Sequence, residues 1–362
     1  LGTANTMGCL SEALGLSLPG SALIPAVYGE RLRSSFMAGR AIVDLVNKGI
    51  TARKIITKES IRNAIKVTMA ICGSTNAVLH LSAVANEAEL GMDVVREFKE
   101  LNKTTPQIAK VNPAAKWDME DFYKAGGIPR VMSRLGDILD TSAITCTGKT
   151  IKENLEEYKF AYPENPEIIK TVDAPFSTTG GVAVLEGNLA PDTAISKPGA
   201  IDPALHHFVG KARCFDSEEA AEEAILGGVI QPGEVVVIRY EGPKGGPGMR
   251  EMFKAMKYMY GAGLSKTCAL VTDGRFSGTN NGCFVGHISP EAAEGGPLAI
   301  VKDGDEILID VNEGKLELHV PEEEIKERFK TWKRPEKDIP RGYLRLYAKV
   351  ASSADKGAII KN

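Results

Sequence analysis

A glycine-rich segment that ends in a carboxylate is the first candidate for chemistry. Residues 242–252 read Gly-Pro-Lys-Gly-Gly-Pro-Gly-Met-Arg-Glu-Met and lead from an apolar run into a predicted helix over 250–260. Glycines let the backbone approach a ligand closely, and the N–H groups that open a helix attract anions. Glu251 falls in the first predicted turn, where the helix dipole favours the ionised carboxylate that a hard cation binds. A plain glycine-rich turn with a capping glutamate explains the pattern at least as well.

The second candidate is a run of small and polar residues, Thr-Asp-Gly-Arg-Phe-Ser-Gly-Thr-Asn-Asn-Gly, at positions 272–282. It follows a predicted strand, and open α/β sheets bind ligands at the carboxyl ends of their strands. The Ser277 hydroxyl could act there as a nucleophile or a base. No GxSxG elbow is present and no histidine has an obvious Ser–His spacing, which disfavours a serine hydrolase. We expect His287, although near in sequence, to be a satisfied structural residue.

A third candidate is the turn Cys72-Gly73-Ser74-Thr75-Asn76, whose side chains supply uncharged donors and acceptors. The N-cap of the helix that follows is a slightly better explanation of this turn. The chain has six cysteines, far apart and without a CxxC pair, so neither a zinc ribbon nor a disulfide scaffold is indicated. Most of them are expected to be buried free thiols.

The composition favours a small-molecule partner. The formal net charge is -3 over 362 residues, and positive and negative residues are scattered along the chain. This argues against a basic surface that binds nucleic acid. No apolar run approaches the ~20 residues that span a bilayer, and no signal sequence opens the chain. We therefore expect no membrane partner and a cytoplasmic location, or an organellar one in a eukaryote. Leu1 replaces a starting Met in what looks like a turn entering a helix, so we expect the natural polypeptide to extend upstream.

The spacing of apolar residues predicts two domains, 1–165 and 166–362. The first is mostly helical, with the linker near 162–169. The second is rich in strands. Helices are predicted over 118–135, interrupted at Gly126-Gly127, and over 150–158, 217–225 and 250–260. Strands are predicted at 181–185, 234–240, 269–272 and 306–311, where β-branched apolar runs are bounded by Gly, Pro or Asp. This order of predicted helices and strands indicates an α/β chain whose second domain is mixed and barrel-like.

Nine short motifs, in order, resemble those of the dihydroxy-acid dehydratase and 6-phosphogluconate dehydratase family. They are GTANTM at 2–7, GSTNAVLHL at 73–81, AGGIP at 125–129, GGVAVLEGNLAPD at 180–192, FDSEEAA at 215–221, GGPGMREM at 245–252, TDGRFSG at 272–278, GHISPEAAEGGP at 286–297 and SSADKGA at 352–358. The likeness covers essentially the whole chain. It implies a helix-rich remnant of an N-terminal α/β domain, followed by a C-terminal mixed domain built round a β-barrel.

The resemblance also implies roles for residues. Glu251 matches the family's C-terminal magnesium ligand and Ser277 its proton-abstracting serine. Substrate-binding residues, less specifically matched, are Ser74, Thr75, Asn76, Arg275 and Gly278. An iron–sulfur cluster, of the 2Fe–2S type, and Mg²⁺ are the implied cofactors. The cluster ligands are expected upstream of Leu1, so Cys9 is not one of them, and Cys72 stands where the family usually has glycine.

The implied reaction is loss of water from a 2,3-dihydroxy carboxylic acid to give a 2-oxo acid, in branched-chain amino-acid biosynthesis. The implied assembly is a homodimer or homotetramer. A sugar-acid dehydratase, acting on an aldonate or 6-phosphogluconate, is the alternative within the family. From another class, the chain could be a non-catalytic fragment or partner subunit, because the cluster ligands are absent. By itself the chain is expected to be inactive.

Overall fold

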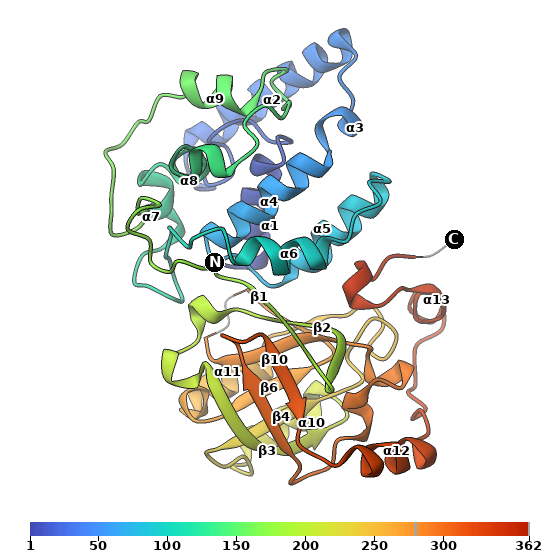
Figure 1. Cartoon of the computed structure of the whole chain (residues 1–362). Coiled ribbons are helices and arrows are strands. Elements are labelled where there is room, and N and C mark those ends of the chain that lie inside the picture. The colour runs from blue at the N-terminus through green and yellow to red at the C-terminus, as the bar shows by residue number, and fades with distance from the viewer. Residues whose placement is uncertain (279–280, 361–362) are drawn as a thin grey trace. The chain divides into compact units, whose positions relative to one another are not determined.

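A computed structural model describes residues 1–278 and 281–360 (Figure 1). Two compact units are present: Leu1–Ala77 with Val84–Val182, and Val78–Ala83 with Ala183–Asn362. The sequence-based boundary at 165/166 lies 17 residues before the observed one at 182/183, because the intervening segment packs on the first unit. The Asn102 side chain donates to the carbonyls of Gly180 (3.0 Å) and Val182 (2.7 Å). None of the described helices is long and apolar enough to cross a membrane.

The first unit is built from helices. They are α1 (Thr3–Ala13), α2 (Gly29–Lys48), α3 (Ala52–Ile55), α4 (Lys58–Ala70), α5 (Asn76–Glu87), α6 (Val94–Asn102), α7 (Met119–Lys124), α8 (Gly127–Leu135) and α9 (Ile151–Glu157). Helix α4 is largely buried and begins with a capping box of Thr57 and Ser60. The predicted break near Gly126 is confirmed: α7 and α8 are separated there by a left-handed backbone, φ 109°.

The second unit is a closed barrel. Its described strands follow one another in the order β1-β10-β9-β3-β4-β6-β8-β2. Their bounds are β1 (Ala183–Gly187), β2 (Ala190–Ser196), β3 (His207–Phe215), β4 (Glu234–Ile238), β6 (Ala269–Thr272), β8 (Cys283–Ser289), β9 (Glu306–Asp310) and β10 (Lys315–Leu318). A separate parallel pair joins β5 (Glu251–Met252) to β7 (Arg275–Phe276). Helices α10 (Glu218–Leu226), α11 (Lys254–Gly261), α12 (Glu322–Thr331) and α13 (Tyr343–Val350) complete the unit.

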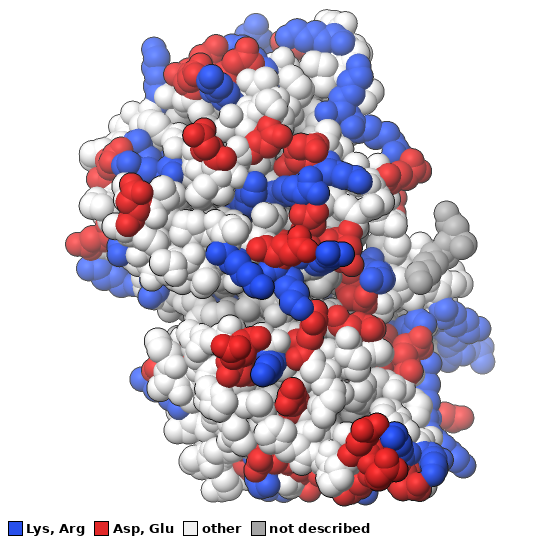
Figure 2. All heavy atoms as spheres, in the orientation of Figure 1, with Lys and Arg blue, Asp and Glu red and all other residues white. Residues whose placement is uncertain are grey.

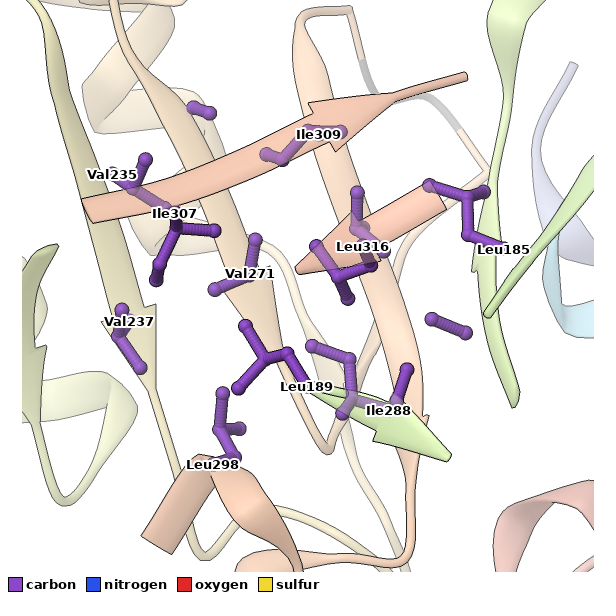
Figure 3. Close-up of a cluster of buried hydrophobic side chains, with 14 of the residues drawn as sticks. Leu185, Leu189, Val235, Val237, Val271, Ile288, Leu298, Ile307, Ile309 and Leu316 are labelled. Atoms are coloured by element: carbon purple, nitrogen blue, oxygen red, sulfur yellow. The ribbon is translucent and has the colours of Figure 1, made fainter. Parts of the chain in front are cut away.

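Alternate residues of the barrel strands serve two different cores. Val235 and Val237 of β4 point into the barrel, where Figure 3 shows them among Val271, Ile307 and other aliphatic side chains. Val236 and Ile238 of the same strand face the opposite way, into a cluster with residues of α10 and α11. A strand covered on both faces has no polar side, which explains the continuous apolar run Val-Val-Val-Ile.

The predicted strands at 181–185, 234–240, 269–272 and 306–311 are confirmed as β1, β4, β6 and β9. Strands β2, β3, β8 and β10 were not predicted. The predicted helix over 250–260 is wrong at its start: α11 begins at Lys254, and Glu251 lies in β5. The glutamate pairs with β7 instead of opening a helix, so the dipole argument for its ionisation does not apply.

Charges of both signs are interspersed on the face of the molecule that Figure 2 shows. Many belong to local ion pairs. The outward side of α12, for example, carries Lys326 paired with Glu322 and Glu323. On that face no broad surface of one sign forms.

Candidate functional site

The β5–β7 pair brings the two most specific candidate residues together. Glu251 lies opposite Arg275 and Met252 opposite Phe276. The Ser277 amide then donates to the Met252 carbonyl at 3.4 Å, which continues the pairing by one residue. Residues in register on neighbouring strands share a face of the sheet, so Glu251 and Arg275 project on the same side. The structure thus joins the GGPGMREM and TDGRFSG motifs at the ends that carry Glu251 and Arg275.

Among the residues that the structure describes, the side chain of Arg275 makes one hydrogen bond to a backbone carbonyl and one long ion pair. Its Nε donates to the Met249 carbonyl, and one terminal nitrogen lies 3.8 Å from Glu251 Oε1. The side chain of Arg275 is 18% exposed and that of Glu251 30%. Burial lowers the pKa of Arg275, and the Glu251 carboxylate opposes that shift. At 3.8 Å the Arg275 nitrogen and the Glu251 oxygen form an ion pair but not a hydrogen bond.

A buried carboxylate ties the motif loops to one another. Asp273, fully buried, accepts from the amides of Tyr240 (3.0 Å), Glu241 (2.9 Å) and Ala292 (2.9 Å). Burial raises its pKa to about 6, and these three backbone donors oppose the shift. Asp273 therefore fixes the start of the 272–278 loop against the two loops beside it.

The predicted anion cradle in the glycine-rich loop is filled by the protein itself. Glu291 accepts from the amides of Lys244 (2.9 Å) and Gly245 (2.8 Å). A Cβ on Gly242 would lie 2.6 Å from Glu291 Oε2, so glycine there makes room for this carboxylate. Burial raises the pKa of Glu291 to about 7. The glycines are thus explained by internal packing, and these two N–H groups are committed to Glu291.

Sequence reasoning missed a buried lysine beside the candidate serine. Lys197 follows β2 directly, is 2% exposed, and donates from Nζ to the Gly278 carbonyl at 3.2 Å. Gly278 is the residue after Ser277. Buried lysines are rare unless paired, so a lysine next to a buried strand would have indicated a functional position. This signal could not be used because β2 itself was not recognised as a buried strand. Thr279 and Asn280 of the same loop lie outside the described residues.

Ser74, Thr75 and Asn76 lie at the start of α5 in the first unit. The Ser74 hydroxyl is 2.9 Å from Thr3 Oγ1 and accepts from the Asn76 amide at 3.2 Å. The Asn76 side chain donates to Thr3 Oγ1 at 2.9 Å, and the Ser74 amide donates to Thr6 Oγ1 at 3.0 Å. Ser74 therefore accepts from the first amide of α5 and links the GSTN turn to the GTANTM helix, whereas the N-cap residue itself, Thr75, makes no side-chain capping bond.

The cysteines of this chain do not fit an iron–sulfur cluster. All six are free, and four (Cys9, Cys72, Cys268 and Cys283) are buried. Burial raises the pKa of the Cys9 thiol far above its usual range and that of Cys283 to about 12, which disfavours the thiolate that iron binds. Among the described residues, no group of three or more His, Cys, Asp or Glu side chains could hold a metal ion.

Magnesium fits Glu251 as a single protein ligand. Mg²⁺ keeps several waters and takes one or two carboxylates together with substrate oxygens, so a partly exposed carboxylate is a suitable donor. The side chain of Glu251 is 30% exposed and carries no short bond to Arg275. The described residues of this chain supply no complete cage for the ion.

Comparison with known proteins gives a consistent result. A family model described as the C-terminal part of dihydroxy-acid/6-phosphogluconate dehydratases matches residues 167–358, and the model of the N-terminal part matches 1–154. Proteins named dihydroxy-acid dehydratase are 50% identical in Acetivibrio thermocellus and 52% identical in Thermodesulfovibrio yellowstonii. A third, from Aquifex aeolicus, is 48% identical. Each alignment covers 99% of this chain but only 64–65% of the relative.

Proposed function

Because this chain belongs to the dihydroxy-acid/6-phosphogluconate dehydratase family, we propose that it is part of an enzyme that removes water from a 2,3-dihydroxy carboxylic acid. It spans just under two thirds of the length of the curated relatives it matches. The observation that carries the proposal is the β5–β7 pair, which sets Glu251 opposite Arg275 and Ser277 one residue beyond. The names of the relatives favour a dihydroxy acid over a sugar acid as substrate.

The reaction requires a base at C2 and a leaving group at C3. The Ser277 alkoxide takes the C2 proton onto Oγ, and the C2–H electrons form the C2–C3 double bond as the C3–O bond breaks. The departing hydroxide takes that proton from Ser277 to form water, which restores the alkoxide, and the resulting enol tautomerises to the 2-oxo acid. A serine hydroxyl is a poor base unless nearby positive charge favours its ionised form. The ammonium group of Lys197, bonded to the carbonyl of the next residue, supplies charge of that sign.

Glu251 and Arg275 bind and orient the substrate in this scheme. Family members are generally metal-dependent, and Mg²⁺ bound through Glu251 stabilises negative charge on substrate oxygens. Arg275 presents guanidinium donors beside that carboxylate. The side chains of Ser74, Thr75 and Asn76 remain proposed substrate contacts. The cysteines of this chain are free and mostly buried, and they do not fit an iron–sulfur cluster. A homodimer or homotetramer is the proposed assembly.

A substrate panel tests the proposal. The cofactor-loaded enzyme that contains this sequence is incubated with 2,3-dihydroxyisovalerate, its 3-methylvalerate homologue, an aldonate and 6-phosphogluconate, and the 2-oxo acid formed is measured. We expect turnover of the two branched dihydroxy acids. Preference for a sugar acid would assign the alternative activity within the family, and absence of 2-oxo acid from all four would refute a dehydratase.

A further inference from the structure

The side chain of Arg250, the residue before Glu251, is held by carboxylates from two other segments of the second unit. Its Nη2 atom lies 2.6 Å from Glu219 Oε1, 3.5 Å from Glu218 Oε2 and 3.8 Å from Glu241 Oε1. Glu218 and Glu219 belong to the first turn of α10, whereas Glu241 follows β4. One guanidinium therefore ties the start of β5 to both segments.

Two of the three carboxylates are buried and need a nearby cation. Glu218 and Glu241 are each 4% exposed. The Glu218 amide donates to Glu241 Oε1 at 3.0 Å, so the two residues are adjacent. Burial raises the pKa of Glu218, and Arg250 opposes that shift. Lys337 Nζ, 3.9 Å from Glu241 Oε1, is a second cation on the same side chain. Since an unpaired buried charge is strongly unfavourable, the acidic pair holds the guanidinium in place.

Glu241 also connects Arg250 to the TDGRFSG motif. Its backbone amide donates to Asp273 at 2.9 Å. A Cβ on Gly274 would lie 2.9 Å from Glu241 Cβ, and a Cβ on Gly246 would lie 2.8 Å from Glu241 Oε2. Glycine at both positions makes room for this glutamate. The carboxylate that Arg250 contacts is therefore packed closely against both the GGPGMREM and the TDGRFSG motif.

Strand β5 is short and follows an irregular turn. It consists of Glu251 and Met252, which pair with β7. Met249, just before Arg250, has φ 44°, so the chain turns sharply ahead of the strand. Successive residues of an extended segment project to opposite sides, and Glu251 shares its side with Arg275. The Arg250 guanidinium thus lies on the other side, and it can act on Glu251 only through the backbone.

We propose that Arg250 is a positioning residue whose guanidinium, held by Glu218, Glu219 and Glu241, sets the backbone of β5 and thereby the direction of the Glu251 carboxylate. This inference rests on the proposed function of Glu251 as a magnesium ligand. It gives the FDSEEAA motif, which no step of the reaction uses, a role: its two glutamates hold the metal-binding strand on the side away from the metal. Groups that orient a metal ligand typically change metal affinity by ~10- to 100-fold when they are removed.

The test compares Arg250→Met with the double variant Arg250→Met/Glu218→Gln. The single variant leaves two buried carboxylates without this cation, so it should lose thermal stability as well as orientation. The double variant removes one of those charges, so stability should recover while the guanidinium that orients β5 is still missing. The Kd of Mg²⁺, measured by calorimetry without substrate on the enzyme that contains this sequence, should rise ~10- to 100-fold in both variants. Arg250→Lys keeps the charge but not the planar fork, and it should recover part of the affinity.

Hydrogen–deuterium exchange measures the strand itself, independently of metal binding. Segments 249–252 and 275–278 should lose protection in both Arg250→Met variants, because the bond from the Ser277 amide to the Met252 carbonyl then opens more often. Arg213→Met is the matched control and should change neither exchange nor affinity. Arg213 also faces two carboxylates, 2.7 Å and 3.8 Å away, but it lies in β3, which does not pair with β5 or β7.

The two measurements separate this inference from the proposed function. Parental exchange and parental magnesium affinity in the double variant would overturn the proposal, since Arg250 would then be only a counter-ion for buried charge. An Arg213→Met variant that weakens magnesium binding equally would also overturn it. Lost protection with parental affinity, in a protein whose Glu251→Gln variant also binds magnesium normally, would refute the metal-binding role of Glu251 and support the positioning of β5 by Arg250.

Discussion

The Ser277 amide donates to the Met252 carbonyl at 3.4 Å, and this bond ties the candidate base to the strand that carries the candidate metal ligand. Glu251 precedes Met252 and lies opposite Arg275. Glu251 and Arg275 are 24 residues apart in the sequence. The β5–β7 pairing places them, and the motifs that contain them, in one short sheet. A change at Ser277 should consequently affect chemistry without disturbing the backbone pairing.

Ser277→Ala should reduce kcat by ~10²–10⁴-fold, the usual contribution of a general acid–base group. The backbone bond to Met252 is kept, so stability should change by less than about 1 kcal/mol and KM only slightly. Steady-state kinetics and thermal unfolding of the cofactor-loaded enzyme measure both. Ser265→Ala, at a buried serine outside the β5–β7 pair, is the matched control. Retention of more than a tenth of parental turnover would show that another group takes the proton.

Glu251→Gln should weaken magnesium binding while the fold is kept, because an amide is a poorer ligand for a hard cation than a carboxylate. Activity measured across a magnesium titration should require a higher concentration for half-saturation. The half-buried glutamate Glu306, changed to Gln, controls for loss of one negative charge from the same unit. An unchanged titration curve would return Glu251 to a purely structural role opposite Arg275.

Strands with an uninterrupted apolar run were predicted from the sequence. Strands whose run is broken by glycine, proline or charged residues were not predicted. Strand β4 is covered on both faces and reads as a continuous apolar run. Strand β8 contains Gly286 and a bulge at His287, and β2 contains Pro191 and Asp192, so neither has a simple period. The register of Glu251 with Arg275 is a long-range pairing, and local periodicity carries no information about such contacts.

The candidate site was predictable in part. Resemblance identified Glu251 and Ser277, but the residues around them depend on tertiary structure. Lys197 contacts Gly278 across 81 positions of sequence, and Glu291 reaches the amides of Lys244 and Gly245 across 46 or more. A glycine-rich loop looks the same in sequence whether a ligand or an internal carboxylate occupies its N–H groups. Only the fold distinguishes the two.

Lys197→Met removes the positive charge beside Ser277 while keeping a chain of similar length. Loss of a nearby cation disfavours the ionised hydroxyl, so the acidic limb of kcat/KM against pH should move to higher pH. Turnover at neutral pH should fall by about tenfold or more, since a shift of one pKa unit is a factor of ten in the ionised fraction. Lys197→Arg keeps the charge and should preserve the position of the limb. A pH profile identical in parent and Lys197→Met would exclude this electrostatic role.

Cys72 offers a test of backbone strain in the first unit. It is buried, with φ 49°, and its thiol lies 3.6 Å from the Gly181 carbonyl. Glycine removes a left-handed penalty of about 1 kcal/mol, whereas alanine removes the thiol but keeps the penalty. Cys72→Gly should therefore be at least as stable as Cys72→Ala, the reverse of the usual order. Urea unfolding of both variants measures the difference, and a clearly more stable alanine variant would contradict it.

Glu291 should make stability fall as pH rises through the weakly acidic range. Burial raises its folded pKa from 4.5 to about 7, with the neighbouring Asp273 charge adding to the shift. The folded state then holds the proton more tightly than the unfolded state. Its stabilising contribution is complete below about pH 4.5 and is lost as pH approaches about 7. Each unit of pKa shift corresponds to ~1.4 kcal/mol, so the pH-dependent part is on the order of 1–3 kcal/mol.

Glu291→Gln cannot titrate, and its amide occupies the same place beside Lys244 and Gly245. The free energy of unfolding, measured by urea titration at several pH values between 4.5 and 7, should decline less steeply in this variant than in the parent. The comparison uses slopes, because the amide accepts the two backbone donors less well and lowers stability overall. Glu323→Gln, at an exposed position of α12, should leave the parental slope intact. Parallel curves for the parent and Glu291→Gln would mean that Glu291 binds no extra proton on folding, and the carboxylate would then be ionised in its cradle throughout this range.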